Sequence, residues 1–386
     1  MGSFNLNIGI YRNTFLPPSE TFIYDQLINL ENSKVKVITR ELKYENYFDF
    51  RNLDIITLIE KEESPLIKKF KKLMFTLSTS SKKMEKSVKE NDIELIHAHF
   101  GVDSIYALKL AKNNNIPLIT TFHGYDITRL PKFTFFPISY MIYYFYINQL
   151  KLKGDLFIAV SNHIKTRLEN AGFPKEKILI HHIGINVNEI PFKEERHNKE
   201  ITFLAVGRLT EKKGTIYLIR AFEKLYYTQK NIKLIIIGDG PLKEDLVNFT
   251  DNLKSKAKIE FRGLLKHSDV IKEMLNADIF CFPSVTATDG DQEGLGMVQL
   301  EAAATGMPVI AFDSGGIKDG IIDGVTGFLI DEKDVNTFSE KMNILTTNKK
   351  LREEMGRKGR NNIEENFDIK KQTRILEKIY EENLKK

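Results

Sequence analysis

The stretch IFCFPSVTATDGDQEGLGMVQLEAAAT, residues 279–305, decides the fold of this chain. It begins with an apolar run typical of a buried strand and ends in an apolar stretch with helical spacing. An acidic loop containing Gly294 and Gly296 lies between them. A strand that passes through a glycine-rich loop into a helix is the unit of doubly wound α/β folds. The unpaired N–H groups and the positive dipole end of such a helix suit a diphosphate.

The same alternation of short apolar runs and helical patterns continues on both sides of this stretch. Strands are predicted at 5–11, 34–39, 95–98, 117–122, 156–161, 201–206, 233–237, 258–262, 279–282 and 308–311. Helices are predicted at 20–30, 104–113, 162–171, 218–227, 243–253, 269–276, 297–305 and 370–386. Because strand–helix alternation implies a parallel sheet and the series occurs twice, we predict two doubly wound α/β domains.

A change in amino-acid composition marks the boundary between the two predicted domains. Residues 189–200 are polar and charged and show little periodicity. We therefore predict an N-terminal domain at 1–188, a linker at 189–200, a C-terminal domain at 201–366 and a terminal helix at 367–386. A chain of 386 residues is long enough for two such cores.

Composition narrows the class of protein. Hydrophobic residues make up 42% of the chain and charged residues 28%, which is ordinary for a globular protein. The net charge of +5 is too small to imply nucleic acid as a partner. The single cysteine, Cys281, rules out an intrachain disulfide and fits a reducing compartment. With no signal peptide or membrane-spanning run in view, we expect a cytoplasmic protein.

Two segments leave a membrane contact open. Lysines at 68, 69, 71 and 72, followed by 82 and 83, alternate with apolar residues between Leu66 and Leu77. Such a helix either packs its apolar stripe inward or contacts an anionic membrane surface, which would be the inner face of the cell membrane. The aromatic run at 133–146 is either a buried helix or an apolar surface for an acceptor or membrane.

Further polar residues follow other predicted strands. Arg208 and Lys213 lie after the strand at 201–206, where a forked guanidinium and an ammonium would neutralise phosphate oxygens. His123 follows the strand at 117–122, at the strand end where doubly wound folds place active sites. His97 and His99 point the same way on a strand, but no third ligand is apparent, and we predict no metal site.

The spacing of Glu293 and Glu301 within EGLGMVQLEA, followed by GMPVIA at 306–311 and SGG at 314–316, resembles the signature of the retaining glycosyltransferase family four. The resemblance extends over nearly the whole chain. It implies a GT-B fold, with two Rossmann-like domains facing across a cleft, an acceptor-binding domain first and a nucleotide-sugar-binding domain second.

The resemblance also implies roles for matching residues. Glu293 and His123 would contact the hydroxyls of the transferred sugar, and Glu301 would bind the ribose. Arg208 and Lys213 would neutralise the departing diphosphate without a metal. Asp126 and His99 would lie on the acceptor side. The remaining donor contacts would come from Gly207, Gly238, Gly240, Arg262, Gly294, Leu295, Gly296, Met297 and Val298. No cofactor is expected; the donor would be a UDP-sugar or a GDP-sugar, and the acceptor a saccharide or lipid-linked saccharide.

The chain departs from the family pattern after its first strand. Many relatives have a glycine pair there, whereas this chain has Ser19, Glu20, Thr21 and Phe22 at the start of a helix. This run resembles a polysaccharide-building subgroup that includes colanic-acid-type transferases, which implies assembly of a cell-surface polysaccharide or glycolipid. Amides near Ser19 and Glu20 would then replace the glycine loop in binding the donor.

Two other functions remain open on the same architecture. A nucleotide-sugar epimerase would need a further set of acid and base groups, and the sequence shows none. A non-catalytic partner subunit would have lost the charged residues of the site, yet Glu293, Arg208 and Lys213 are all present. A hexosyltransferase is therefore the predicted activity.

Overall fold

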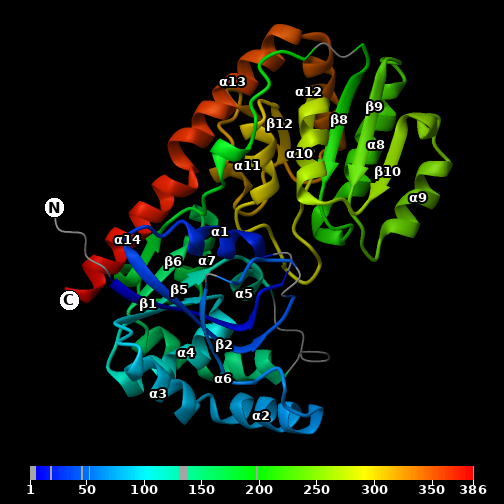
Figure 1. Ribbon diagram of the computed structural model, residues 1–386. Helices are drawn as coiled ribbons and strands as arrows, with labels where there is room; N and C mark the ends of the chain where they lie inside the picture. Colours follow the sequence, from blue (N-terminus) through cyan, green and yellow to red (C-terminus); the bar gives the residue numbers. More distant parts are fainter. Residues whose placement is uncertain are drawn as a thin grey trace. The chain divides into compact units, whose positions relative to one another are not determined.

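The computed structural model describes residues 6–17, 20–44, 47–51, 53–129, 138–196 and 199–385. The chain divides into two compact units (Figure 1). Unit 1 comprises Met1–Ile127, Pro131–Gly184 and Ile369–Lys386, and unit 2 comprises Thr128–Leu130 and Ile185–Asp368.

Unit 1 is built on a parallel sheet with the strand order β3-β2-β1-β4-β5-β6-β7. Its strands are β1 (Leu6–Phe15), β2 (Ser33–Leu42), β3 (Asp54–Thr57), β4 (Leu95–His99), β5 (Leu118–Phe122), β6 (Leu156–Ala159) and β7 (Ile178–Ile180). Its helices are α1 (Thr21–Ile28), α2 (Pro65–Ser78), α3 (Lys82–Glu90), α4 (Gly101–Asn114), α5 (Tyr125–Thr128), α6 (Ile138–Lys153), α7 (Asn162–Asn170) and α14 (Ile369–Leu384). The central strands β4 and β5 are buried throughout, as expected for a sheet covered on both faces.

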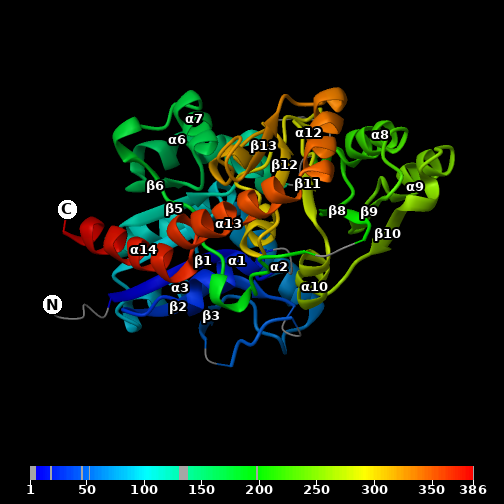
Figure 2. The ribbon, with the colours of Figure 1, turned by 90° about the horizontal axis from the view of Figure 1, so that it is seen from above.

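Unit 2 repeats the architecture with the strand order β10-β9-β8-β11-β12-β13, again parallel. Its strands are β8 (Ile201–Val206), β9 (Ile232–Ile237), β10 (Ile259–Gly263), β11 (Ile279–Phe282), β12 (Val309–Phe312) and β13 (Gly327–Ile330). Its helices are α8 (Thr215–Tyr226), α9 (Lys243–Asp251), α10 (His267–Asn276), α11 (Met297–Ala304), α12 (Val335–Thr347) and α13 (Lys349–Asn366). Viewed from above, α8 and α12 lie on one side of β8 and β9 and α10 lies on the other (Figure 2).

The predicted two-sheet α/β class is confirmed, and the predicted strands are found with small shifts at their ends. The prediction missed β3, β7 and β13, and each of these is the edge strand of its sheet. Edge strands are short and half-exposed, so they lack the continuous apolar run that marks a central strand. The three missed strands are therefore edge strands whose sequence pattern is too weak to predict them.

The last helix belongs to unit 1. The break between α13 and α14 falls at Phe367 and Asp368, where the sequence pattern predicted one. Tyr380 packs into the apolar core of unit 1, and its hydroxyl lies 2.7 Å from Nδ1 of His97. The carboxylate of Glu377 accepts hydrogen bonds from the backbone N–H and side-chain amide of Asn32 and from the hydroxyl of Ser33. These polar contacts fix α14 against the sheet of unit 1.

None of the described helices is long and apolar enough to cross a membrane.

Candidate functional site

The strand order of unit 2 reverses between β8 and β11, which lie side by side. In doubly wound sheets, ligands bind outside the carboxyl ends of the strands at such a switch point. The loop after β8 and the loop after β11 meet here, because the N–H of Val285 donates to the carbonyl oxygen of Lys212 at 2.8 Å. Two segments about 75 positions apart thus form one surface.

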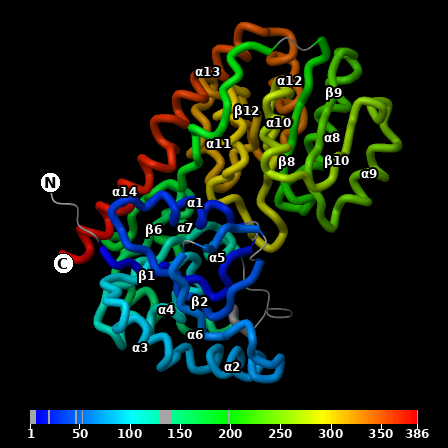
Figure 3. The backbone as a smooth tube through the Cα atoms, viewed as in Figure 1, coloured from blue at the N-terminus to red at the C-terminus, as the bar shows by residue number. Residues whose placement is uncertain are grey.

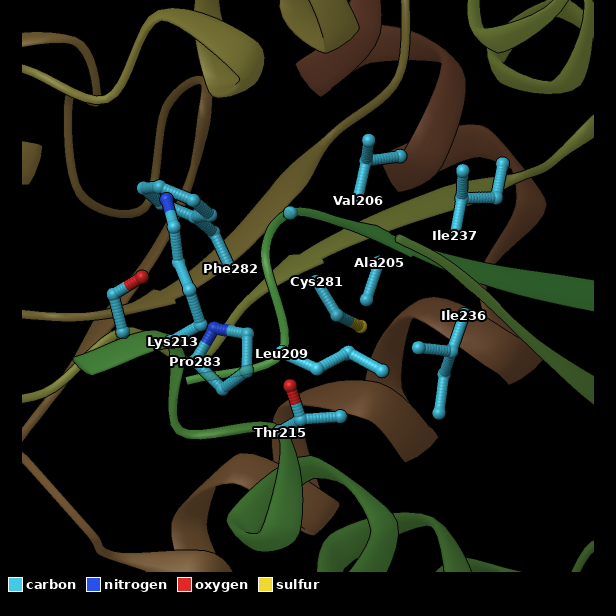
Figure 4. A pocket seen from close by; sticks show the side chains of 12 residues that line it. Ala205, Val206, Leu209, Lys213, Thr215, Ile236, Ile237, Cys281, Phe282 and Pro283 are labelled. Carbon is cyan, nitrogen blue, oxygen red and sulfur yellow. The ribbon is translucent and has the colours of Figure 1, made fainter. Parts of the chain in front are cut away.

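Lys213 and Glu293 form an ion pair on this surface. Nζ of Lys213 lies 2.8 Å from Oε1 of Glu293, and the hydroxyl of Ser284 lies 3.4 Å from the same oxygen. The Lys213 ammonium also lies 4.9 Å from the centre of the Phe282 ring, and the close view shows its chain running beside that ring (Figure 4). Burial raises the pKa of Glu293, but the charges of Lys213 and Lys212 outweigh it and hold that pKa below its ordinary value. Glu293 is therefore a buried, ionised carboxylate.

Arg208 lies at a pocket of about 540 Å³, which is also lined by Gly207, Gly238, Gly240 and Asp239 together with Leu264, Leu265 and Val270. The arginine is exposed, and no acidic side chain in the described ranges forms an ion pair with it. Lys213, by contrast, already has a carboxylate partner. Arg208 is thus the cation of this pocket that is available to an anion.

Glycines let the backbone close the floor of the pocket. A Cβ atom on Gly238, whose φ is +139°, would lie 2.0 Å from the carbonyl oxygen of Gly207. A Cβ atom on Gly240 would lie 2.4 Å from the carbonyl oxygen of Leu209. Both distances are far below van der Waals contact, so the pocket requires glycine at these positions.

Helix α11 begins at this surface. Gly296 precedes it in a left-handed conformation with φ +83°, and its missing side chain leaves room for the Phe282 ring. Gly294 and Leu295 are buried, whereas Met297 and Val298 in the first turn are partly exposed. The amides of this turn have no partner within the helix, and they carry the positive end of its dipole.

Glu301 lies about one turn after the start of α11. One of its carboxylate oxygens is 3.0 Å from Nε2 of His267, the first residue of α10. The contact of His267 with Glu301 could not be predicted from the sequence, because no local pattern shows that the start of α10 lies beside α11.

Arg262 differs from Arg208, because its guanidinium is ion-paired with both Glu260 and Glu273. Its hydrogen bond with Glu260 raises the pKa of Arg262. Because the Arg262 side chain is engaged in these ion pairs, a ligand would meet the backbone of this strand. One backbone group nearby, the carbonyl of Gly263, accepts a hydrogen bond from the N–H of Gly238. A donor-binding role for Arg262 would therefore fall on its backbone.

Unit 1 brings its own histidines together at the carboxyl ends of β4 and β5. Nδ1 of His99 lies 3.0 Å from Nε2 of His123. The rings of Phe22 and Phe100 pack on the His123 ring, with centroid distances of 4.9 Å and 4.5 Å. Burial lowers the pKa of His123 well below its ordinary value, with further lowering from the charge of Arg12. His123 is thus neutral, and its Nδ1 has no hydrogen-bond partner among the described residues.

His97 plays a structural part. Its two ring nitrogens contact the hydroxyls of Tyr380 and Thr121, each at 2.7 Å. Burial lowers the pKa of His97 to about 3, so it stays neutral. Within the described ranges, no three His, Cys, Asp or Glu side chains gather where they could hold a metal ion.

Asp126 is buried beside the loop that carries His123. Its carboxylate accepts hydrogen bonds from the backbone N–H groups of Gly101, His123 and Gly124. Burial raises the pKa of Asp126 to about 6 against the lowering effect of these bonds. The side chain therefore holds the loop that carries His123, and its place on the acceptor side stays a prediction.

Glu20 is held by a buried ion pair. Its carboxylate binds the guanidinium of Arg12 with two hydrogen bonds, of 2.9 Å and 2.5 Å, and Arg12 also pairs with Asp103. The backbone N–H of Glu20 donates to the carbonyl of Pro17. Both groups of Glu20 therefore contact the protein itself in this structure, and its contact with the donor stays a prediction. Ser19 lies outside the described residues, as does part of the aromatic run, residues 133–137.

Two profiles of known families match the sequence. The family described as Glycosyltransferase Family 4 matches residues 19–189, and the family described as Glycosyl transferases group 1 matches residues 186–362. Together they span both units.

Similar proteins include WcaL of Salmonella typhimurium, which is named as a colanic acid biosynthesis glycosyltransferase. The two are 31% identical over 64% of this chain and 59% of WcaL, so the match spans about three fifths of that relative's length. An uncharacterized glycosyltransferase of Methanocaldococcus jannaschii, MJ1178, is 31% identical over 88% of this chain and 89% of its own length.

Among solved structures, Anabaena Alr3699/HepE in complex with UDP and glucose is similar with a TM-score of 0.75 and 17% identity. The match covers 98% of this chain and 100% of that one. The likeness confirms the predicted GT-B fold.

Proposed function

We propose, since this chain belongs to glycosyltransferase family 4, that it moves a hexose from a nucleoside diphosphate sugar to an acceptor hydroxyl with retention of anomeric configuration. The donor is a UDP-sugar, with a GDP-sugar as the alternative. The reaction needs neither a metal ion nor another cofactor. Relatives of the WcaL type support assembly of a cell-surface polysaccharide or glycolipid.

The proposal rests above all on the Lys213–Glu293 pair and on Arg208, which has no ion-pair partner among the described residues. Glu293 is ionised and buried, so it can accept hydrogen bonds from sugar hydroxyls but cannot readily act as an acid. Lys213 and Arg208 supply two positive charges at the strand ends where a diphosphate would lie. Charge that develops on the departing diphosphate would be stabilised by these fixed cations.

The first turn of α11 adds to this stabilisation. Amides of Met297 and Val298 are unpaired within the helix, and they would donate to diphosphate oxygens. Glu301 would accept hydrogen bonds from both ribose hydroxyls in place of its contact with His267. The pocket beside Arg208, Gly238 and Gly240 is large enough for the base.

The neutral side chain of His123 is suited to a hydrogen bond with a sugar hydroxyl. Because its imidazole is neutral and Nδ1 has no partner among the described residues, it would hydrogen-bond a hydroxyl without adding charge. A proton of the attacking hydroxyl would pass to an oxygen of the leaving diphosphate, so the protein needs no separate general base.

The choice of UDP is supported by the HepE complex with UDP and glucose, and the acceptor is a saccharide or a lipid-linked saccharide. The single cysteine fits a reducing cytoplasm, where nucleotide sugars would meet the enzyme. We propose that the reaction takes place at the inner face of the cell membrane.

The anomer of the sugar released in slow donor hydrolysis tests the stereochemistry without knowledge of the acceptor. The protein would be incubated with UDP-glucose in excess EDTA while proton NMR follows the released sugar before it mutarotates. The proposal predicts that α-glucose appears first and that Mg²⁺ does not change the rate. Initial release of β-glucose, or dependence on a divalent cation, would overturn the retaining, metal-independent reaction.

A further inference from the structure

Helix α2 turns its apolar side away from the protein. Six of its large apolar side chains are exposed, the most open being Leu66 at 81%, Phe70 at 64% and Leu77 at 60%. The others are Ile67, Leu73 and Met74. With 3.6 residues per turn, all six fall on one stripe of the helix. The tube trace shows α2 along the outer side of unit 1 (Figure 3).

The opposite side of α2 faces unit 1. Phe75 is its buried side chain, and the Phe75 ring stacks on Tyr106 of α4 at 5.4 Å. Lysines surround this contact. Lys72 pairs with Glu41 at 2.7 Å, and Lys71 pairs with Glu63. The charged side of the helix is therefore the side that the protein binds.

The outward direction of the apolar stripe distinguishes between the two interpretations of the α2 sequence, a stripe packed inward and a stripe that contacts a membrane. An ordinary surface helix packs its apolar stripe on the core and turns its lysines to water. Here the apolar stripe lies in solvent, and its hydration is unfavourable by about 25 cal/mol per Å². Isolated exposed apolar residues need no explanation, but a contiguous stripe indicates an interaction surface.

We propose that this stripe inserts into the surface of an anionic lipid bilayer. Burial of Leu66, Phe70 and Leu77 among acyl chains would remove the exposed apolar area. Lys69 has no ion-pair partner within the described residues and lies one turn from both Leu66 and Leu73, at the edge of the stripe. There it would meet lipid phosphate groups. The proposal does not depend on the transferase reaction.

Charge favours a bilayer over a second copy of the chain. Helix α2 holds Lys68, Lys69, Lys71 and Lys72 and no acidic residue. Lys69 borders the stripe, so two such helices packed stripe to stripe would bring their Lys69 side chains close together, whereas anionic headgroups would attract them. Each lysine near an anionic bilayer is expected to strengthen binding roughly fivefold.

The chain contains no tryptophan, so Phe70→Trp would introduce a single fluorescent reporter at the centre of the stripe. Vesicles of phosphatidylcholine with phosphatidylglycerol should shift its emission to the blue, and lipid quenchers should reduce it. Ile375→Trp is the matched control, because Ile375 is also exposed, at 45%, but lies on α14. Its emission should not change.

Binding strength is measured by co-sedimentation of the full chain with the same vesicles. Phe70→Ser together with Leu77→Ser should weaken binding at least tenfold, and Lys69→Glu at least fivefold. Ile375→Ser should bind like the parent. Because the altered side chains are exposed, melting temperatures and donor hydrolysis in solution should stay unchanged, which separates this test from that of the transferase.

Three results would overturn the proposal. One is a Phe70→Trp spectrum that vesicles leave unchanged. Another is equal binding to pure phosphatidylcholine, which would remove the role of the lysines. The third is a dimer in sedimentation velocity that Phe70→Ser dissociates, which would assign the stripe to a second copy of the chain.

Discussion

Nζ of Lys213 lies 2.8 Å from Oε1 of Glu293, and this pair joins the loop after β8 to the loop after β11. Glu293 is 8% exposed, so its charge depends on the nearby ammonium. Breaking one side of a buried pair leaves an uncompensated charge.

Lys213→Ala should therefore destabilise unit 2 by about 3 kcal/mol or more, and the pKa of Glu293 should rise because burial is then opposed only by Lys212 and the hydroxyl of Ser284. The double variant Lys213→Ala, Glu293→Gln should regain much of this loss, since no buried charge remains. Chemical denaturation of the four proteins gives the coupling energy. Additive effects of the two substitutions would show that the pair does not stabilise the fold.

Glu301 should recognise the ribose. Glu301→Ala is expected to raise the dissociation constant for UDP by about 10- to 100-fold, the loss of hydrogen bonds to a charged group. Binding of pyrophosphate, which has no ribose, should change little. His267→Ala is the matched control, because it removes the group that contacts Glu301 in this structure. Isothermal titration with both ligands separates the cases; an equal loss for UDP and pyrophosphate would contradict a ribose contact.

Gly238 should not tolerate a side chain. Gly238→Ala places a Cβ atom 2.0 Å from the carbonyl oxygen of Gly207, and the backbone must move. Gly324→Ala is the control, since Gly324 also has a positive φ, +70°, but has open space around it. We expect the first variant to lose at least about 2 kcal/mol more stability than the second. Similar melting temperatures for the two would show that the loop after β9 can move to admit a side chain at Gly238.

Asp126 should make stability fall as pH rises. Its folded-state pKa of about 6 lies above the ordinary value of 3.8, so between these values the folded protein binds the proton more tightly. Relative to Asp126→Asn, the parent should lose stability from pH of about 4 to about 6. The pKa of Asp334 is lowered from its ordinary value of 3.8 by hydrogen bonds at the start of α12, so relative to Asp334→Asn the parent should gain stability as pH rises towards about 4. Melting curves from well below pH 4 to above pH 6 check both signs.

The sequence predicted those features of the site that depend on neighbouring residues in the chain. Gly294, Gly296 and Arg208 follow strands closely enough for their surroundings to be foreseen. Contacts between distant segments could not be foreseen, such as Lys213 on Glu293 or His267 on Glu301.

Glu20 shows the limit most clearly, because its partner Arg12 is held from the other side by Asp103, 91 positions away from Arg12. No spacing rule reveals such a buried network. Helix α2 shows another limit. Its periodicity predicted an apolar stripe, but periodicity is the same whether the stripe points in or out. Only the position of Phe75 against Tyr106 settles its direction.

The most direct test of the central claim is nucleotide diphosphate release from a panel of UDP- and GDP-sugars in EDTA, with melting temperature followed in parallel. One donor should stabilise the protein and release its diphosphate, and Arg208→Ala should reduce release by about 10²- to 10³-fold without altering the fold. Arg374→Ala, which changes an exposed arginine on α14, should behave like the parent. A folded protein that no nucleotide sugar stabilises, or release that Arg208→Ala leaves unchanged, would contradict the claim.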